Sequence, residues 1–273
     1  MSKNSNSRDV YINGELFQHD KALININDRG FRYGDGVFET IRVNDGNLFR
    51  FNSHLQRLES GLKAIKVDFD VSKMEASCHD LLNKNQIVNG FLRISISRGE
   101  GSLGYLPKEG NKPTIVMQTV EMGDVDNKPV DLWLSSYRKI PDICLPANIK
   151  SAQGLNSTLA RMEARENKCF EALLLSVDGK ICEGSSGNIF WFKGGKLYTP
   201  ENNILKGVMR EAVIEKSPYD VVTDDFDLDE LSDAEEVFMT NVAWVIKPIS
   251  SLQPEGIKWQ ETKVSEQMRE LVL

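Results

Sequence analysis

Two side chains in the second half of the chain could take part in covalent or acid–base chemistry. Lys150 follows a loop that contains Pro141 and Pro146, and it precedes a helical pattern. Burial and a helix N-terminus both disfavour an ammonium, so a lysine placed there can act as a nucleophile or a base. Glu183 lies among small residues in ICEGSSGNIF, where a carboxylate can pair with a ring nitrogen. A solvated loop lysine and an acidic strand end are the ordinary alternatives for these two positions.

Three further positions could bind anions. The glycine of LKGVMREA stands where a helix begins, and free amides at a helix N-terminus bind phosphate, although no Walker motif is present. Arg57, in HLQRL, lies on the polar side of its helix, where a surface arginine is the ordinary alternative. Arg98 ends a strand and enters the glycine-rich loop of ISRGEGSLGY, where it is either an exposed charge or a carboxylate clamp. An amine, a ring-nitrogen partner, phosphate anchors and a carboxylate clamp together suit pyridoxal phosphate.

The elements that would position these residues are mixed helices and strands. Asn13-Gly14 and Asn44-Asp45-Gly46 predict tight hairpin turns, because Gly and Asn adopt positive φ at little cost. Apolar residues spaced three and four apart predict helices, at 53–65, 71–85 and 152–168, with another that begins near Gly207. Alternating or continuous apolar runs predict strands, at 91–99, 113–120 and 130–137, and a meander over 171–200 that turns at Asp178-Gly179 and Gly194-Gly195. A further strand region over 236–249 is interrupted by Thr240 and Asn241.

The fold class predicted from this pattern is α/β, of the mixed α+β kind, because strands and helices do not alternate regularly. The polar segment EMGDVDNKP, residues 121–129, ends in proline and is the candidate linker between two domains. The predicted organisation is therefore an N-terminal α/β domain over residues 1–120, the linker 121–129, and a C-terminal domain over residues 130–273.

Composition narrows the possible partners of this 273-residue chain. Its net charge is −7, and no run of Lys and Arg exceeds two residues, so nucleic-acid binding is not expected. No apolar stretch approaches the roughly 18 residues of a membrane helix, and the polar N-terminus has no signal-peptide core, so a cytoplasmic location is the default expectation. No metal site is predicted, because the three histidines and four cysteines lack ligand spacing; the cysteines are expected to be reduced and mostly buried: Cys78, Cys144, Cys169 and Cys182.

Several stretches, in order and spacing, resemble the class IV (fold-type IV) pyridoxal-phosphate enzymes. These include branched-chain and D-amino-acid aminotransferases and 4-amino-4-deoxychorismate lyases. The matching stretches run from about Tyr11 to Pro248: DRGFRYGDGVFETIRV, HLQRL, ISRGEGSLGY, IKSAQGLNSTLARMEA, EALLLSVDGKICEGSSGNIFW, LYTP, ILKGVMR and EVFMTN. The resemblance implies a smaller N-terminal α/β domain, a larger C-terminal one that binds pyridoxal 5′-phosphate, a small-molecule amine substrate, and a homodimer.

The resemblance also implies roles for individual residues. Lys150 would bind the coenzyme covalently and move the proton during catalysis, and Glu183 would pair with the pyridine nitrogen. The remaining cofactor-binding positions comprise a phosphate-binding arginine, a side chain packed on the ring, two backbone amides and two small polar residues of the phosphate cup; these are Arg57, Leu205, Val208, Met209, Thr240 and Asn241.

Within the family, four features resemble the lyases: FETIRV, with Thr40 near the reacting carbon, the loop that contains Arg98 and Tyr105, the stretch NIFWFKGGKLYTP, and MTN. The predicted activity is therefore release of pyruvate from 4-amino-4-deoxychorismate to give 4-aminobenzoate for folate synthesis. Leu103 departs from the arginine of many lyases, Gln153-Gly154 departs from branched-chain enzymes, and Tyr105 replaces the histidine of D-amino-acid enzymes. A class IV aminotransferase of branched-chain or D-amino acids is the alternative, and a non-enzymatic scaffold is a third hypothesis.

Overall fold

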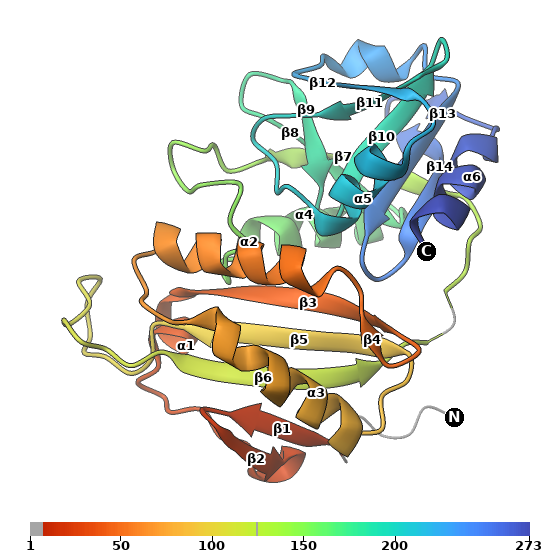
Figure 1. Cartoon of the computed structure of the whole chain (residues 1–273). Helices are drawn as coiled ribbons and strands as arrows, with labels where there is room; N and C mark the ends of the chain where they lie inside the picture. Colours follow the sequence, from red (N-terminus) through yellow and green to blue (C-terminus); the bar gives the residue numbers. More distant parts are fainter. Residues whose placement is uncertain (1–7, 124) are drawn as a thin grey trace. The chain divides into compact units, whose positions relative to one another are not determined.

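The computed structural model describes residues 8–123 and 125–273, which form two compact units (Figure 1). The first unit is Met1–Asp124 together with Ile149–Gln153, and the second is Val125–Asn148 together with Gly154–Leu273. Both contain helices and sheets, which confirms the mixed α/β class, and the second unit is the larger.

The first unit is built on a six-stranded sheet in the order β2-β1-β6-β5-β3-β4, with every neighbouring pair antiparallel. Its strands are β1 (Asp9–Ile12), β2 (Glu15–Gln18), β3 (Gly36–Asn44), β4 (Asn47–Leu48), β5 (Gly90–Ser97) and β6 (Thr114–Glu121). The two predicted hairpin turns are confirmed, since Asn13, Gly14, Asp45 and Gly46 all have positive φ.

Two helices cover one face of this sheet, and they correspond to the helices predicted at 53–65 and 71–85 (Figure 1). They are α2 (Phe51–Ala64) and α3 (Glu75–Lys84), the latter preceded by the 3-10 turn η3 (Val71–Met74). Leu58 and Leu62 of α2 pack with Ile41 and Ile94 of the strands in one buried core. The first unit also contains η2 (His19–Lys21) and the short helix α1 (Arg29–Tyr33). Because side chains alternate along a strand, the residues between these core positions point to the opposite face of the sheet.

The segment Ile149–Gln153 packs with the first unit, which differs from the predicted continuous domain 130–273. Phe38 N–H donates to the Lys150 carbonyl at 3.0 Å, and Ala152 N–H donates to the Gly36 carbonyl at 2.9 Å. The segment therefore lies antiparallel alongside β3, and the helix predicted from residue 152 begins only at Leu155. Extended pairing with a distant strand leaves no trace in local apolar periodicity, which explains the difference.

The second unit is built on a nine-stranded sheet in the order β12-β11-β10-β13-β14-β7-β8-β9, with β15 paired to β14. Its strands are β7 (Val130–Arg138), β8 (Glu171–Leu175), β9 (Ile181–Gly184), β10 (Asn188–Lys193), β11 (Lys196–Pro200), β12 (Asp220–Asp224), β13 (Glu236–Asn241), β14 (Val245–Gln253) and β15 (Ile257–Lys258). Its helices are α4 (Leu155–Glu166), α5 (Val208–Lys216), η4 (Leu228–Leu231) and α6 (Lys263–Val272). Large buried side chains such as Trp191 and Met239 form its core.

The apolar run 236–249, predicted as one strand region, is a hairpin of two antiparallel strands. Asn241 Oδ1 accepts hydrogen bonds from the amides of Ala243 and Trp244, at 2.9 and 3.0 Å. This asparagine therefore stabilises a tight turn between β13 and β14. The sequence analysis expects an interruption of this strand region at Thr240 and Asn241, and the turn lies there, because β13 ends at Asn241 and β14 begins at Val245.

The cysteines follow the sequence-based expectation closely. Cys78, Cys169 and Cys182 are buried free thiols and Cys144 is an exposed one, in the described part of the chain. Burial raises the pKa of the Cys78 thiol to about 12 and that of Cys182 to about 11. Within residues 8–123 and 125–273, no helix has the length and apolar character needed to cross a membrane.

Candidate active site

Lys150 lies in the first unit, in the extended segment that pairs with β3. Its carbonyl is fixed by Phe38 N–H, and its Nζ lies 4.8 Å from the centroid of the Phe38 ring. The expected helix N-terminus does not begin at Lys150, because α4 starts five residues later. The amine is instead positioned by backbone pairing with β3 and by packing on an aromatic face, which a cation favours.

Beside Lys150, a buried cluster joins β3 to α2. Glu39, 1% exposed, accepts hydrogen bonds from Arg57 Nε at 2.6 Å, Arg57 NH2 at 2.7 Å and His54 Nδ1 at 2.8 Å. Burial by itself raises the pKa of Glu39, but the bonds from Arg57 and His54 outweigh it and lower that pKa to about 2. The guanidinium of Arg57 is therefore held in a fixed plane by a charged, two-point contact.

His54 is completely buried and is a member of this cluster that sequence reasoning missed. Burial lowers the pKa of His54, and the charges of Arg57 and Lys150 lower it further, although the hydrogen bond to Glu39 opposes them. The imidazole is therefore neutral at neutral pH and donates through Nδ1. His54 Nε2 has no hydrogen-bond partner among the described residues. The signal was present, since His54 opens the same HLQRL motif that contains Arg57.

The face of the six-stranded sheet opposite the helices carries a cavity of about 210 Å³. Its walls include Phe38 of β3, Arg93 and Ser95 of β5, and Ala152. Arg93 stacks over the Phe38 ring with its CZ atom 4.0 Å from the centroid. Thr40 pairs in register with Arg93, so its side chain points to this same face. The cavity thus presents one guanidinium beside aromatic and hydroxyl groups, a combination suited to a substrate carboxylate.

Arg93 is the second functional candidate that sequence reasoning missed. It lies in the alternating strand FLRISIS, where the prediction attended to the arginine at the end of the strand, Arg98. The usable signal was the alternation itself: Leu92 and Ile94 are fully buried, so the residue between them faces the other side of the sheet.

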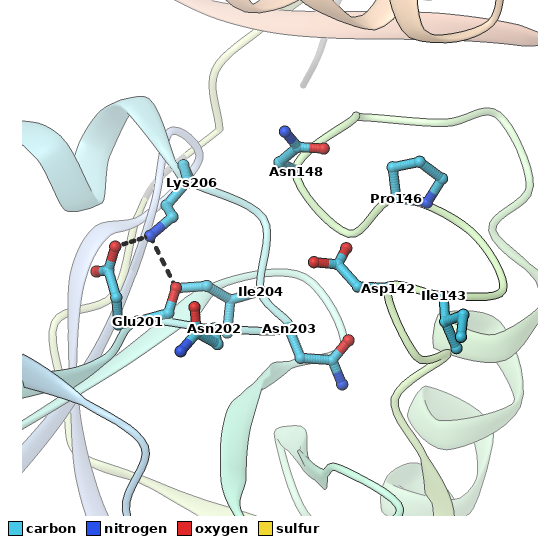
Figure 2. Close-up of a pocket in the computed structure, with 9 residues that line it drawn as sticks. All are labelled: Asp142, Ile143, Pro146, Asn148, Glu201, Asn202, Asn203, Ile204 and Lys206. Carbon is cyan, nitrogen blue, oxygen red and sulfur yellow. Dashed lines mark hydrogen bonds and ion pairs between the residues drawn. The ribbon is translucent and has the colours of Figure 1, made fainter.

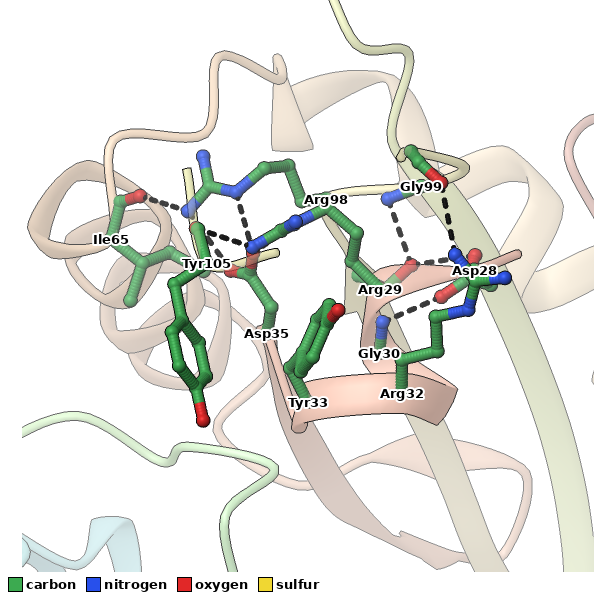
Figure 3. Close-up of polar contacts among 12 residues, drawn as sticks. Asp28, Arg29, Gly30, Arg32, Tyr33, Asp35, Ile65, Arg98, Gly99 and Tyr105 are labelled. Atoms are coloured by element: carbon green, nitrogen blue, oxygen red, sulfur yellow. Dashed lines mark hydrogen bonds and ion pairs between the residues drawn. The ribbon is translucent and has the colours of Figure 1, made fainter. Parts of the chain in front are cut away.

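Arg98 is engaged in a network that ties the end of β5 to the loop before β3 (Figure 3). Its Nε and NH2 donate to the two oxygens of Asp35 at 2.8 and 2.9 Å, and it also donates to the carbonyls of Ile65 and Lys66. Burial alone would raise the pKa of Asp35, but hydrogen bonds from Arg98 and Arg29 lower it. These contacts fix the loop, and the substrate-binding role of Arg98 stays a prediction.

Tyr105 lies in the exposed loop that Arg29 holds in place. Arg29 donates to the carbonyls of Gly104 and Tyr105 at 2.9 and 2.8 Å, and the Tyr105 ring lies 5.6 Å from that of Tyr33 (Figure 3). The Tyr105 side chain is 86% exposed. Tyr105 does not line the cavity described above, and its contact with substrate stays a prediction.

In the second unit, Glu183 lies at the end of β9 and is 5% exposed. Its Oε1 accepts from Leu205 N–H at 3.1 Å and from Lys139 Nζ at 2.5 Å, and its Oε2 accepts from Asn188 Nδ2 at 3.0 Å. Asn188 also donates to the Leu205 carbonyl at 2.8 Å. The carboxylate and the Leu205 segment are therefore fixed relative to each other, as the predicted pairing with a ring and packing on that ring both require.

The N-terminus of α5 lies directly after this segment. No described side chain caps it, and Val208 and Met209, whose amides were predicted to bind phosphate, are the first two residues of the helix. A Cβ at Gly207 would lie 2.2 Å from Asn188 Oδ1, so only glycine lets Asn188 reach Glu183 while α5 begins here. Lys139 and Asn188 were both missed by sequence reasoning, although Asn188 belongs to the EGSSGN motif.

Thr240 and Asn241, the predicted small polar residues, shape the turn between β13 and β14. Thr240 Oγ1 donates to the Val245 carbonyl, and Asn241 Nδ2 donates to the Ser186 carbonyl at 3.1 Å. Thr240 thus stabilises the turn itself, and Asn241 holds it against the loop that follows Glu183. Their role in a phosphate cup stays a prediction.

A second cavity, of about 520 Å³, lies in the second unit and contains none of the predicted site residues (Figure 2). It lies between the loop that contains Asp142, Pro146 and Asn148 and the segment 201–206. Lys206 pairs with Glu201 on one side of it, and Ile143 on the other is 95% exposed. Across the described residues, no group of three or more His, Cys, Asp or Glu side chains could hold a metal ion.

Comparison with known proteins gives a consistent family for this chain. A model of class IV aminotransferases matches residues 36–252. The chain is 34% identical, over 88% of its length and 86% of the relative, to a Methanocaldococcus jannaschii protein provisionally named a branched-chain-amino-acid aminotransferase, and 32% identical over 89% and 86% to the aminodeoxychorismate lyase of Bacillus subtilis. The crystal structure of the Escherichia coli branched-chain aminotransferase superposes with a TM-score of 0.91, at 26% identity, over 97% of this chain and 93% of that one. The protein therefore belongs to the class IV aminotransferase family of enzymes.

Proposed function

We propose that this protein is a pyridoxal-phosphate-dependent 4-amino-4-deoxychorismate lyase, which releases pyruvate and 4-aminobenzoate for folate synthesis. The observation that supports it best is the pairing of Thr40 with Arg93 on the cavity-bearing face of the six-stranded sheet. A hydroxyl beside a guanidinium suits a substrate that carries both a carboxylate and a leaving oxygen. The resemblance to lyases in FETIRV and the aminodeoxychorismate lyase of Bacillus subtilis support the same choice.

The residues present fit pyridoxal 5′-phosphate, the coenzyme of this family. Solved relatives are complexed with pyridoxamine 5′-phosphate or N-(5′-phosphopyridoxyl)-L-glutamate. In this chain, Glu183 is a buried carboxylate whose Oε2 meets only the neutral amide of Asn188 among the described residues, so it can still accept from a ring nitrogen. The N-terminus of α5, without a side-chain cap, offers amides for a phosphate. Both groups would therefore bind the coenzyme, as the resemblance to the family implies.

The coenzyme supplies an aldehyde that captures amines and a ring that accepts electrons. Lys150 Nζ would hold it covalently and, when displaced by the substrate amine, would take the proton from the carbon that bears that amine. Arg57, held in plane by Glu39, would contribute a fixed positive charge for the phosphate. Arg93 would hold a substrate carboxylate in the cavity, with the Phe38 ring against the carbocycle.

The proposed reaction balances as an elimination. The proton on the amine-bearing carbon leaves to Lys150, and the bond between the neighbouring carbon and the enolpyruvyl oxygen breaks. The departing enolpyruvate takes up a proton at its methylene carbon and becomes pyruvate, while the carbocycle of the substrate becomes aromatic. Thr40, which pairs with Arg93 on the cavity-bearing face, would donate a hydrogen bond to the departing oxygen and stabilise the charge that develops in the transition state.

An assay with matched substrates tests this proposal. The purified holoenzyme should release 4-aminobenzoate and pyruvate in equal amounts from 4-amino-4-deoxychorismate, measured by fluorescence and a coupled dehydrogenase. Thr40→Val, which keeps the shape of the side chain, should slow release more than Thr40→Ser does. Transfer of amino groups from leucine or D-alanine to a 2-oxo acid, with no 4-aminobenzoate formed, would refute the lyase assignment.

Such a transfer reaction is the second candidate function, and the comparisons favour it. Branched-chain and D-alanine aminotransferases are relatives at 28% and 29% identity, and two solved branched-chain aminotransferases superpose with a TM-score of 0.91. The wall of the cavity also includes the apolar side chains of Val116, Phe31 and Ile24, which could contact an aliphatic amino acid.

We also propose that the protein is a homodimer. Apolar side chains around α1 and the loop after β5 are highly exposed, and an apolar patch of this kind marks a protein interface; they are Leu23, Ile26, Phe31, Leu103 and Leu106. Light scattering after size exclusion should give twice the chain mass. Phe31→Glu should shift it toward the monomer, whereas Ile143→Glu, at a similarly exposed apolar residue of the second unit, should not. A monomeric wild-type protein would overturn the proposal.

A further inference from the structure

Lys139 is a cation at the proposed site for which the mechanism above has no use. It follows directly after β7, and its backbone N–H donates to the Leu175 carbonyl at 2.8 Å. Its Nζ lies 2.5 Å from Glu183 Oε1, and the two side chains are only 19% and 7% exposed. The ammonium is therefore held against the carboxylate from a backbone that is itself fixed to the sheet.

This ion pair differs from the other lysine pair near β9. Lys180 pairs with Asp227 on the surface, where the side chains are 34% and 64% exposed and solvent screens the interaction. Around Lys139 and Glu183 there is little solvent, so their interaction is stronger for the same charges. A buried pair of this kind affects any third charge that approaches the carboxylate.

The other charged or titratable groups near Glu183 are already engaged. Arg210 is close enough for its charge to interact with Glu183, but it pairs with Glu201 at 3.0 Å and donates to the Pro200 carbonyl. Cys182 is buried, its thiol pKa is raised, and its sulfur accepts from Asn203. Lys139 is therefore the cation that bonds directly to Glu183 in the described part of the chain.

The two carboxylate oxygens have unequal surroundings. Oε1 meets the ammonium of Lys139 and the Leu205 amide, whereas Oε2 meets the neutral amide of Asn188. A protonated ring nitrogen that bonds to Oε2 would share the carboxylate with Lys139, a cation on the other oxygen. Two cations on one carboxylate each weaken the hold of that carboxylate on the other.

We propose that Lys139 is a positioning residue that fixes Glu183 and limits how strongly this carboxylate retains a proton on the ring nitrogen of the coenzyme. The inference rests on the proposed function, in which Glu183 faces that nitrogen. Its consequence is a ring that can exchange its proton at moderate pH and is not permanently protonated. The strength of the electron sink in this enzyme is thus set by a pair of residues.

The test measures the protonation of the ring nitrogen directly. Holoenzyme is reconstituted with coenzyme labelled with ¹⁵N in the ring, and the ¹⁵N chemical shift is followed against pH. Lys139→Gln retains a hydrogen-bond donor and removes the charge, so the midpoint of ring deprotonation should rise by about one pH unit. In Lys139→Arg the midpoint should equal that of the wild type, because this variant retains the positive charge. Lys180→Gln is the matched control that removes an equal charge from the surface pair.

The midpoints measured in these variants either support or overturn the role proposed for Lys139. A raised midpoint in Lys139→Gln and also in Lys139→Met, with Lys139→Arg and Lys180→Gln unchanged, supports the proposal. An unchanged or lowered midpoint in both uncharged variants overturns it, as does an equal shift in Lys180→Gln. Glu183→Gln separates the two levels of inference. If it lowers the midpoint while Lys139→Gln has no effect, only the role of Lys139 fails; if it too has no effect, the proposed pairing of Glu183 with the ring fails.

Discussion

The two units each contain a buried glutamate with three hydrogen-bond donors, and the two sites are built differently. In the first unit, the guanidinium of Arg57 bonds to both oxygens of Glu39, and His54 completes the set. In the second unit, the ammonium of Lys139 bonds to one oxygen of Glu183, and the other oxygen meets a neutral amide. Both oxygens of Glu39 are therefore occupied by Arg57, and Glu39 serves to orient that guanidinium. Glu183 retains an oxygen that can accept a hydrogen bond from a further cation.

The largest expected effect concerns Lys150, the amine beside the Glu39 cluster. Lys150→Ala should reduce turnover about a thousandfold or more, since both the covalent attachment and the proton transfer are lost. The visible absorbance of covalently held coenzyme should disappear, while the thermal unfolding temperature should change little because Lys150 is half-buried and held mainly by its backbone. Persistence of that absorbance would mean that another lysine binds the coenzyme.

The next effect distinguishes an orienting carboxylate from an acting one. Glu39→Gln should lower the free energy of unfolding by about 3 kcal/mol, because the buried guanidinium of Arg57 loses its opposite charge. Urea unfolding of the protein without coenzyme measures this. Glu59→Gln, which breaks the exposed pair with Lys63 on the same helix, is the control and should cost less than about 1 kcal/mol. An equal loss of free energy of unfolding in the two variants would show that the Glu39 cluster stabilises the fold no more than a surface ion pair does.

Glu183→Gln should act on catalysis more than on folding. We expect kcat to fall about a hundredfold, the size of an acid–base contribution, because the ring nitrogen loses its charged partner. Unfolding by urea should change less than for Glu39→Gln, since Lys139 is 19% exposed and can turn toward water. A stability loss as large as that of Glu39→Gln, with kcat unchanged, would reverse the roles that the comparison assigns.

The smallest effect is a dependence of stability on pH. The folded pKa of Glu39 is about 2 against an ordinary value of 4.5, so the folded protein binds fewer protons than the unfolded chain in this range. The stability from Glu39 is complete above about pH 4.5 and is lost as the pH falls toward 2, with about 1 kcal/mol lost between pH 5 and 3.5. Urea unfolding at these two pH values should show that loss in the wild type and less of it in Glu39→Gln. The lowered pKa of His54 acts in the same direction below its ordinary value of 6.5 and remains in the variant.

Local patterns predicted most of the helices and strands, because each buries one side against a core. The face with Leu58 and Leu62 became α2, and the turn at Asn13-Gly14 became the first hairpin. The segment Ile149–Gln153 was misassigned, because it is extended through pairing with β3. Pairing with a remote strand has no local period to detect.

At the site, motifs predicted residues such as Glu183, Arg57 and Lys150, since a chemical role constrains the residue type at a position. The partners of these residues were missed, because no direct chemical role marks them in the sequence. Glu39, Lys139 and Asn188 act through hydrogen bonds to those residues, and 44 positions separate Lys139 from Glu183 along the chain. A lysine in a loop has the same appearance in the sequence whether its ammonium meets water or a buried carboxylate.

The sequence by itself determined the family, the coenzyme chemistry and the alternation that directs each strand residue to one face of its sheet. Only the tertiary structure decided which cation meets which carboxylate, that Lys150 packs with the first unit, and that Arg93 and not Arg98 lines the cavity. Covalent order fixes what each residue can do, whereas burial and distance fix which partner it meets, and these depend on segments that are far apart in the chain.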